Sequence, residues 1–242
     1  MSDLSGTTTI VVGASRGLGH GVASAIAEAG AEVIAVSRTE ATFPGSVKQE
    51  LADGRDAGVA ADLIARHAPD TVVLVAGAVP HMAPLTEQTW ETFSVTWETD
   101  VRIAFEWVGA ILRAPLRPGS RVVVFSSGAA LAGSPLSGGY AGAKSTQRFI
   151  TAYAQGEAKR AGLDITFTTV LPRFAPTAAV GKAGVEAYAA QSGVSVEKFL
   201  SQQGPLLTPE IAGTAVVDLL GTPTAGLAPG YVLSGAGAQK LN

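Results

Sequence analysis

Short runs of apolar, largely β-branched residues recur along the chain, and alanine-rich stretches of helical character separate most of them. The runs lie at residues 9–12, 32–36, 71–75, 121–125, 164–170 and 231–233. Alternation of this kind is typical of βαβ units, whose parallel strands are buried on both faces. The pattern therefore predicts an α/β fold in which the last run forms an edge strand. Thr208 and Pro209 predict the N-cap and the first residue of the preceding helix.

The composition predicts one folded domain that spans residues 1–242. Hydrophobic residues make up 47% of the chain and the mean hydropathy is +0.29, values that argue against disorder. No repeat or linker divides the 242 residues. The pattern breaks down at about residues 172–207, where prolines and glycines bracket short helical stretches. Such a segment is usually either a functional lid or disordered, and we favour a lid.

Charge and residue content exclude several functions. Only 15% of residues are charged and the net charge is −3, so nothing favours nucleic acid or an anionic membrane as a partner. Without cysteine the chain has no disulfide or thiol catalysis, and its three isolated histidines predict no metal site. No Gly-x-Ser-x-Gly elbow supports a serine hydrolase. The polar N-terminus and the short apolar runs predict a cytoplasmic protein without signal peptide or membrane span.

A glycine-rich turn follows the first apolar run and leads directly into a helical pattern. Strand, glycine turn and helix in this order place backbone N–H groups and a helix N-terminus against a pyrophosphate. A tight turn without a ligand is the alternative, and the strand-to-helix context argues against it. We therefore predict a dinucleotide site that includes Gly13, Ser15, Arg16, Gly17, Leu18 and Gly19.

The end of the second predicted strand indicates which dinucleotide binds. It carries Ser37 and Arg38 where an acidic residue would accept hydrogen bonds from an adenosine ribose. An acid there would repel a 2′-phosphate, whereas Arg38 and Arg16 can both pair with one. The sequence thus predicts NADP(H) as the cofactor, the alternative being two ordinary surface arginines.

Two serines end the run at 121–125, and Tyr140 stands thirteen residues after the second of them, Ser127. Tyr140 and Lys144 lie four apart, so on a helix they share one face, where an ammonium favours the phenolate form of tyrosine. Taken alone, Ser127 would be a capping residue and Tyr140 a core residue. The upstream glycine turn makes a catalytic site the better hypothesis.

The Gly-x-x-x-Gly-x-Gly turn and the Ser127, Tyr140 and Lys144 spacing resemble the short-chain dehydrogenase/reductase family of classical type. The resemblance runs from Thr9 to about Gly237, except in the segment 172–207. It implies a single-domain Rossmann fold, with a doubly wound, seven-stranded parallel sheet and helices on both faces. It also implies that Ser127 hydrogen-bonds the substrate oxygen, Tyr140 transfers the proton and Lys144 binds the nicotinamide ribose.

The resemblance implies further cofactor contacts. Asp53 is similar to an aspartate that contacts adenine, and Ala76-Gly77 is similar to the end of an Asn-Asn-Ala-Gly segment whose asparagines are replaced here. Pro172 and Thr177 resemble a loop that faces the nicotinamide.

Two positions depart from the family pattern. Asp100 stands where an asparagine normally supports a water-mediated proton relay to the lysine, and a carboxylate can accept the same hydrogen bonds. Arg173 replaces a usual glycine. It is either an ordinary exposed arginine or a contact for an anionic substrate group.

These observations predict an NADP(H)-dependent oxidoreductase that interconverts a carbonyl and an alcohol in a small to medium, largely uncharged substrate. Two alternatives stay open: a dinucleotide-binding protein without turnover, as a sensor or inactive oligomer partner, and an isomerase, dehydratase or epimerase on the same scaffold. The resemblance also implies a homotetramer or homodimer formed through the helices near Trp107 and after Tyr140. Phe174, Tyr188 and Phe199 are candidates for an apolar pocket beneath the lid.

Overall fold

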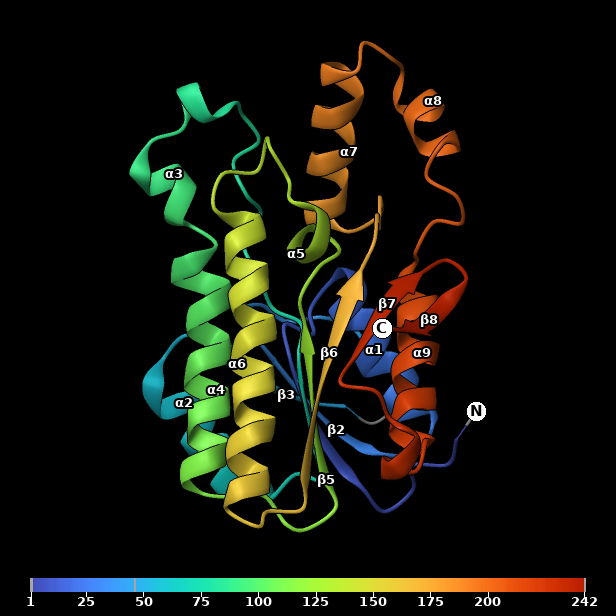
Figure 1. The fold of residues 1–242 in the computed structure, drawn as a ribbon. Coiled ribbons are helices and arrows are strands. Elements are labelled where there is room, and N and C mark those ends of the chain that lie inside the picture. Colours follow the sequence, from blue (N-terminus) through green and yellow to red (C-terminus); the bar gives the residue numbers. More distant parts are fainter. Residues whose placement is uncertain (1, 46, 242) are drawn as a thin grey trace.

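The computed structural model describes residues 2–45 and 47–241. Within these residues a sheet of eight strands lies at the centre of the molecule, in the order β3-β2-β1-β4-β5-β6-β7-β8 (Figure 1). The order reverses between β1 and β4, as in a doubly wound sheet. The strands are β1 Thr8–Val12, β2 Glu32–Ser37, β3 Val47–Leu51, β4 Thr71–Leu74, β5 Ser120–Phe125, β6 Ile165–Pro172, β7 Gly230–Ser234 and β8 Gly237–Lys240.

All six apolar runs form strands, but the sheet has eight strands rather than the seven that the family resemblance implied. β3 lies at one edge of the sheet and is largely exposed, so its sequence, VKQEL, lacks a continuous apolar run. The extra strand is β8, which runs antiparallel to β7 after a two-residue turn, Gly235-Ala236, and begins at Gly237, where φ is +89°. β7 is therefore paired on both sides and is not the edge strand that the sequence predicted.

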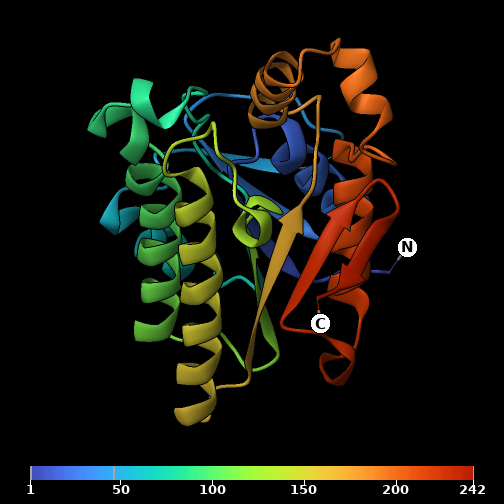
Figure 2. The ribbon, with the colours of Figure 1, turned by 45° about the horizontal axis from the view of Figure 1, so that its top comes forward.

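Helices cover both faces of the sheet (Figures 1 and 2). Helices α1 and α9 bury one face, and α2, α4 and α6 bury the other, each with its own apolar cluster. Thr208 caps α9 by accepting a hydrogen bond from Ile211 N, with Pro209 as the first residue, which confirms the predicted helix start. The helices are α1 Gly17–Glu28, α2 Ala57–His67, α3 Trp90–Ser94, α4 Arg102–Arg113, α5 Ala129–Ala132, α6 Tyr140–Arg160, α7 Ala179–Gln191, α8 Val196–Ser201 and α9 Pro209–Gly221. Short turns are the 3₁₀ helices η1 Leu85–Glu87 and η3 Thr224–Gly226, and a π-helix η2 Trp97–Val101.

The segment 172–207 forms α7 and α8, which stand above the carboxyl ends of the parallel strands (Figure 1). Val185, Ala189 and Phe199 form a small apolar cluster there, and Phe174 packs edge-on against Phe199 with ring centroids 5.6 Å apart. The hydroxyls of Tyr188 and Ser134 lie 2.7 Å apart and connect α7 to the loop after α5. None of the described helices is both long and apolar enough to cross a membrane.

Glycine permits the close packing of α1 against α9. A Cβ atom on Gly21 would lie 2.1 Å from the carbonyl oxygen of Pro209, and one on Gly213 would lie 2.4 Å from the carbonyl oxygen of Gly21. Both distances are far below van der Waals contact, so a side chain at either position would push the two helices apart.

We expect Gly21→Ala to lower the free energy of unfolding by about 1–3 kcal/mol, the usual effect of overpacking a core. Gly58→Ala is the matched control, because nothing lies within 4 Å of the new methyl group in α2. Alanine there should raise stability by up to about 1 kcal/mol, since glycine disfavours a helix. Urea unfolding of the two variants measures both effects, and a Gly21→Ala protein at least as stable as wild type would contradict the packing argument.

Candidate active site

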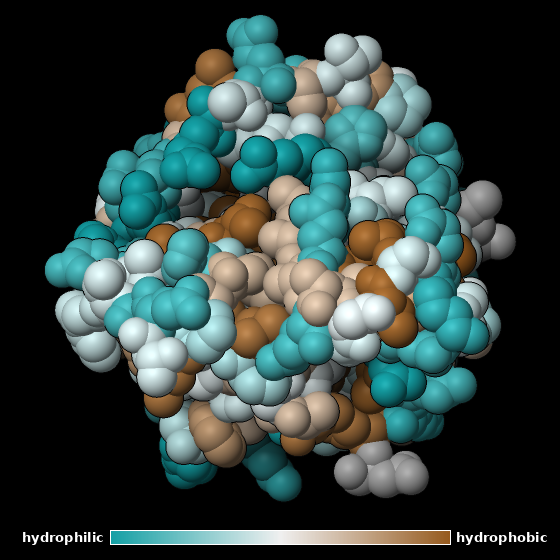
Figure 3. All heavy atoms as spheres, turned by 90° about the horizontal axis from the view of Figure 1, so that it is seen from above, coloured by the Kyte–Doolittle hydropathy of each residue, from teal (hydrophilic) through white to brown (hydrophobic). Residues whose placement is uncertain are grey.

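A hollow of about 640 Å³ opens above the carboxyl ends of the parallel strands, partly covered by α7 and α8 (Figure 3). Ligands of doubly wound folds bind at this edge, where the strand order reverses. Nearly all the predicted site residues line the hollow: Gly13, Ser15, Arg16, Gly17, Leu18, Gly19, Ser37, Arg38, Asp53, Ala76, Gly77, Asp100, Ser127, Tyr140, Lys144 and Pro172. Thr177 does not. It is exposed in the loop before α7, and its neighbours Ala178 and Ala179 line the hollow instead.

The glycine turn after β1 brings its backbone close to the neighbouring strand. Gly13 has φ +94°, and a Cβ atom there would lie 2.5 Å from the backbone nitrogen of Ala76. Helix α1 begins at Gly17, and its N-cap residue Arg16 makes no side-chain capping hydrogen bond. The first N–H groups of α1 therefore have no side-chain acceptor, as an anion-binding helix N-terminus requires. This cradle fits the pyrophosphate of a dinucleotide.

Arginines line the end of the hollow next to β2 and β3. Arg16 and Arg38 are exposed and form no ion pair with any described residue. Asp53, the predicted adenine contact, is held by the guanidinium of Arg55, with Nη2 2.6 Å from Oδ2 and Nε 3.0 Å from Oδ1. These hydrogen bonds lower the pKa of Asp53 to about 2. Sequence reasoning missed Arg55, although its position two residues after the aspartate permits this contact.

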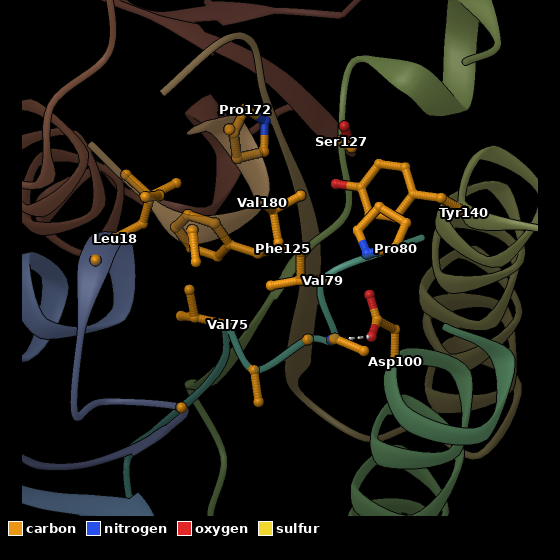
Figure 4. A pocket seen from close by; sticks show the side chains of 18 of the residues that line it. Leu18, Val75, Val79, Pro80, Asp100, Phe125, Ser127, Tyr140, Pro172 and Val180 are labelled. Atoms are coloured by element: carbon orange, nitrogen blue, oxygen red, sulfur yellow. Dashed lines mark hydrogen bonds between the residues drawn. The ribbon is translucent and has the colours of Figure 1, made fainter. Parts of the chain in front are cut away.

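Lys144 and Asp100 form a buried ion pair at the other end of the hollow. Lys144 Nζ lies 2.9 Å from Asp100 Oδ2, and their side chains are 6% and 0% exposed. The ammonium also donates to Gln147 Oε1 at 3.0 Å and to the carbonyl oxygen of Phe125 at 3.4 Å. Two of its three protons thus have hydrogen-bond acceptors, whereas Asp100 Oδ2 lies within ion-pair distance and accepts no hydrogen bond. Asp100 Oδ1 accepts a hydrogen bond from Ala78 N at 2.7 Å (Figure 4).

The electrostatics of this pair keep Lys144 charged. Burial by itself lowers the pKa of Lys144, but the charges of Asp100 and Tyr140 and the contact with the Asp100 carboxylate act in the opposite direction. The net result is a pKa above the ordinary value of lysine. The ammonium therefore persists as the pH rises, in a site that would otherwise discharge it.

The backbone around Asp100 forms a π-turn. Val101 N reaches back five residues to the carbonyl oxygen of Thr96 at 3.4 Å, and the indole of Trp97 donates to the carbonyl oxygen of Gly139 at 3.1 Å. The second contact ties η2 to the residue before α6. Such turns often occur at functional sites, because they change which face of the helix a side chain occupies.

Gln147 is a buried member of the site that sequence reasoning missed. Its amide nitrogen donates to the carbonyl oxygen of Asp100 at 3.0 Å, while its oxygen accepts from Lys144. The available signal was its spacing, since a residue three positions after Lys144 lies on the same face of the helix.

Ser127 and Tyr140 face the hollow from neighbouring elements (Figure 4). Ser127 follows β5, and its hydroxyl oxygen accepts a hydrogen bond from Ala129 N at 3.2 Å. Tyr140 is the first residue of α6, and Lys144 Nζ lies 5.6 Å from its ring centroid. The structure therefore brings Ser127, Tyr140, Lys144 and Asp100 to one end of the hollow. No cluster of three or more metal-ligating side chains occurs in the described part of the chain.

Comparison with known proteins identifies the family. The family model for short chain dehydrogenases matches residues 7–186, which is most of the chain, and the chain therefore belongs to that family. Its members are oxidoreductases that bind NAD or NADP. No curated protein matches the sequence significantly.

Solved structures of similar fold include a short chain dehydrogenase from Mycobacterium avium, with 18% identity, a TM-score of 0.77 and coverage of 100% of this chain and 86% of that one. A short chain dehydrogenase family protein from Francisella tularensis has 18% identity, a TM-score of 0.79 and coverage of 95% and 98%. A provisionally assigned NAD(P)-dependent gluconate 5-dehydrogenase from Beutenbergia cavernae, with NADP bound at low occupancy, has 25% identity, a TM-score of 0.75 and coverage of 90% of each chain. The first two likenesses are evidence of fold alone.

Proposed function

We propose that the protein is an NADP(H)-dependent oxidoreductase that reduces a carbonyl to an alcohol, or catalyses the reverse reaction. The observation that carries the proposal is the convergence of Ser127, Tyr140 and the buried Lys144–Asp100 pair at one end of a hollow that also contains the glycine turn. Membership of the short chain dehydrogenase family supports the same reaction class.

The residues present fit a dinucleotide. The glycine turn and the uncapped start of α1 would hold the pyrophosphate, while Arg16 and Arg38 would pair with a 2′-phosphate. Bound NADPH would supply a hydride equivalent to the substrate.

The side chains supply the proton and stabilise charge. Ser127 Oγ already accepts a hydrogen bond from Ala129 N, so its own proton is free to be donated to the substrate oxygen. Tyr140 Oη delivers its proton to the same oxygen as negative charge develops there. The Lys144 ammonium, 5.6 Å from the ring, then stabilises the phenolate that remains.

Lys144 needs a free donor if it is to bind the nicotinamide ribose. Its contact with the Phe125 carbonyl oxygen, at 3.4 Å, is the longest of its three polar contacts and the weakest by geometry. We expect this contact to be exchanged for the ribose hydroxyl, while the pair with Asp100 persists.

Oxidation of NADPH in the presence of ketones, diketones and quinones, followed by absorbance, tests the activity. Tyr140→Phe should lower kcat/KM by about 10²–10⁴-fold, the usual contribution of general acid catalysis. Tyr153→Phe is the matched control on the same helix and should retain full activity, because Tyr153 does not line the hollow and the substitution keeps its ring. NADPH that binds without being oxidised across the whole panel would contradict the proposal and favour a protein without turnover or an isomerase-type activity.

Cofactor choice is tested by binding. Arg38→Asp should weaken NADPH about 10- to 100-fold, the loss expected when a charge-assisted hydrogen bond is removed, with a much smaller effect on NADH. Fluorescence titration with each nucleotide provides the comparison. Equal losses for NADPH and NADH would contradict the 2′-phosphate assignment.

We further propose a homodimer or homotetramer that uses the outer faces of α4 and α6. Phe105, Phe149 and Tyr153 are 61%, 56% and 64% exposed there, and the rings of Phe149 and Tyr153 stack with centroids 6.1 Å apart. Exposed apolar patches often mark interfaces. Phe149→Asp should shift the mass in sedimentation equilibrium towards the 24.4 kDa of one chain. A wild-type protein that is already monomeric would contradict the proposal. The cytoplasmic location stays a prediction.

A further inference from the structure

We propose that Arg173 binds an anionic group of the substrate, so that the natural substrate is a carbonyl compound, or its alcohol, that carries a carboxylate beside an apolar body. The inference rests on the proposed function and adds a substrate class to it. It departs from the largely uncharged substrate expected from the sequence.

The backbone of Arg173 is fixed next to the proposed catalytic residues. Arg173 directly follows β6, and its N–H donates to the carbonyl oxygen of Leu233 at 2.8 Å. Arg173 lines the hollow, and its Cγ would lie 3.9 Å from a Cβ atom at Gly128. Gly128 follows Ser127 in sequence. The aliphatic part of Arg173 therefore lies close to the backbone of the residue that follows Ser127.

The charge of Arg173 is not compensated by the protein. Arg173 forms no ion pair with any residue in the described ranges. Lys144 and Asp100, which also line the hollow, neutralise each other. The other charged residues that line the hollow belong to the β1–α1 turn and to the ends of β2 and β3, where the adenosine half of the cofactor would lie: Arg16, Arg38, Asp53 and Arg55. One uncompensated positive charge thus remains at the substrate end.

Apolar residues from the lid and from the loop after α5 also line the hollow. Among them are Ala132, Pro135, Phe174, Val180 and Phe199, and the top view shows apolar residues in its floor beneath a hydrophilic rim (Figure 3). An arginine at the edge of such a wall can bind a carboxylate through two parallel N–H···O bonds, while the rest of the ligand contacts carbon atoms. A neutral substrate would leave the guanidinium of the exposed Arg173 hydrogen-bonded to water alone.

Binding of two matched ketones tests the inference. Phenylglyoxylate and phenylglyoxylamide share an aryl ketone and differ in charge. Neither can react when NADP⁺ is the nucleotide, because ketone and nucleotide are then both oxidised, so calorimetry measures binding alone. Wild-type protein should bind the acid at least about tenfold more tightly than the amide, as expected for a charge-assisted contact.

Arg173→Met should abolish this preference, and Arg173→Lys should retain part of it, since an ammonium keeps the charge but not the paired donors. Arg113→Met is the matched control, because Arg113 is also exposed and without an ion pair among the described residues, but lies at the end of α4, outside the hollow. It should leave the preference unchanged. Titrations without nucleotide give the same comparison in case NADP⁺ binds weakly.

Equal affinities for acid and amide in wild type, or a preference that survives Arg173→Met, would overturn the inference. So would an Arg173→Met protein whose affinity for NADP⁺ falls as much as its affinity for the acid, because Arg173 would then bind the nucleotide. Reduction of neutral ketones without any preference for the acid would refute this inference and leave the proposed function intact. An Arg173-dependent preference for the acid in a protein that reduces no carbonyl would refute the proposed function and leave the anion-binding role of Arg173 intact.

Discussion

The buried ion pair between Lys144 and Asp100 is the interaction on which the site depends. It joins α6 to the π-turn η2, and through Ala78 N and the Phe125 carbonyl oxygen it also reaches the segments that follow β4 and complete β5. A charged pair with so little solvent contact depends on the hydrogen bonds of its partners: Asp100 Oδ1 accepts one from Ala78 N, whereas Oδ2 has the ion pair alone. Removing one partner of such a pair typically destabilises a protein by about 3–5 kcal/mol. The geometry around Tyr140 is therefore coupled to the stability of the fold.

The pair also determines how charge is distributed along the hollow. Because Asp100 neutralises Lys144 directly, the catalytic end has little net charge of its own, and Arg173 supplies the excess positive charge there. Arg16 and Arg38 supply it at the nucleotide end. Two separate positive regions with an apolar wall at the substrate end suit two anionic ligands, a phosphorylated nucleotide and an acidic substrate.

Much of the fold and the site could be predicted because their signals are local. Buried strands need apolar runs, and the glycine turn needs residues without side chains, so both leave a pattern in the sequence. β3 and β8 lack such a pattern because they lie at the edges of the sheet, where one side of each strand has no neighbour to pair with. Arg55 and Gln147 were missed because their roles follow from tertiary contacts. Thr177 was placed by resemblance in a loop whose neighbouring residues, rather than Thr177 itself, line the hollow.

The protonation of Lys144 tests the central claim most directly. Its Nζ can be titrated by ¹⁵N-detected NMR in wild type and in Asp100→Asn, with the signal assigned by its loss in Lys144→Met. In wild type the pKa of Lys144 should lie above the ordinary value of lysine. The contribution of the charged Lys144 to the stability of the fold is therefore complete below the ordinary pKa of lysine, and it is lost as the pH rises through the folded-state pKa. In Asp100→Asn burial should dominate, and the midpoint should fall below the ordinary value, with the alkaline limb of the pH–rate profile moving to lower pH. Asp218→Asn, an exposed change on α9, should alter neither the Lys144 midpoint nor the pH–rate profile. The same Lys144 midpoint in wild type and Asp100→Asn, with both limbs of the profile unchanged, would contradict the account.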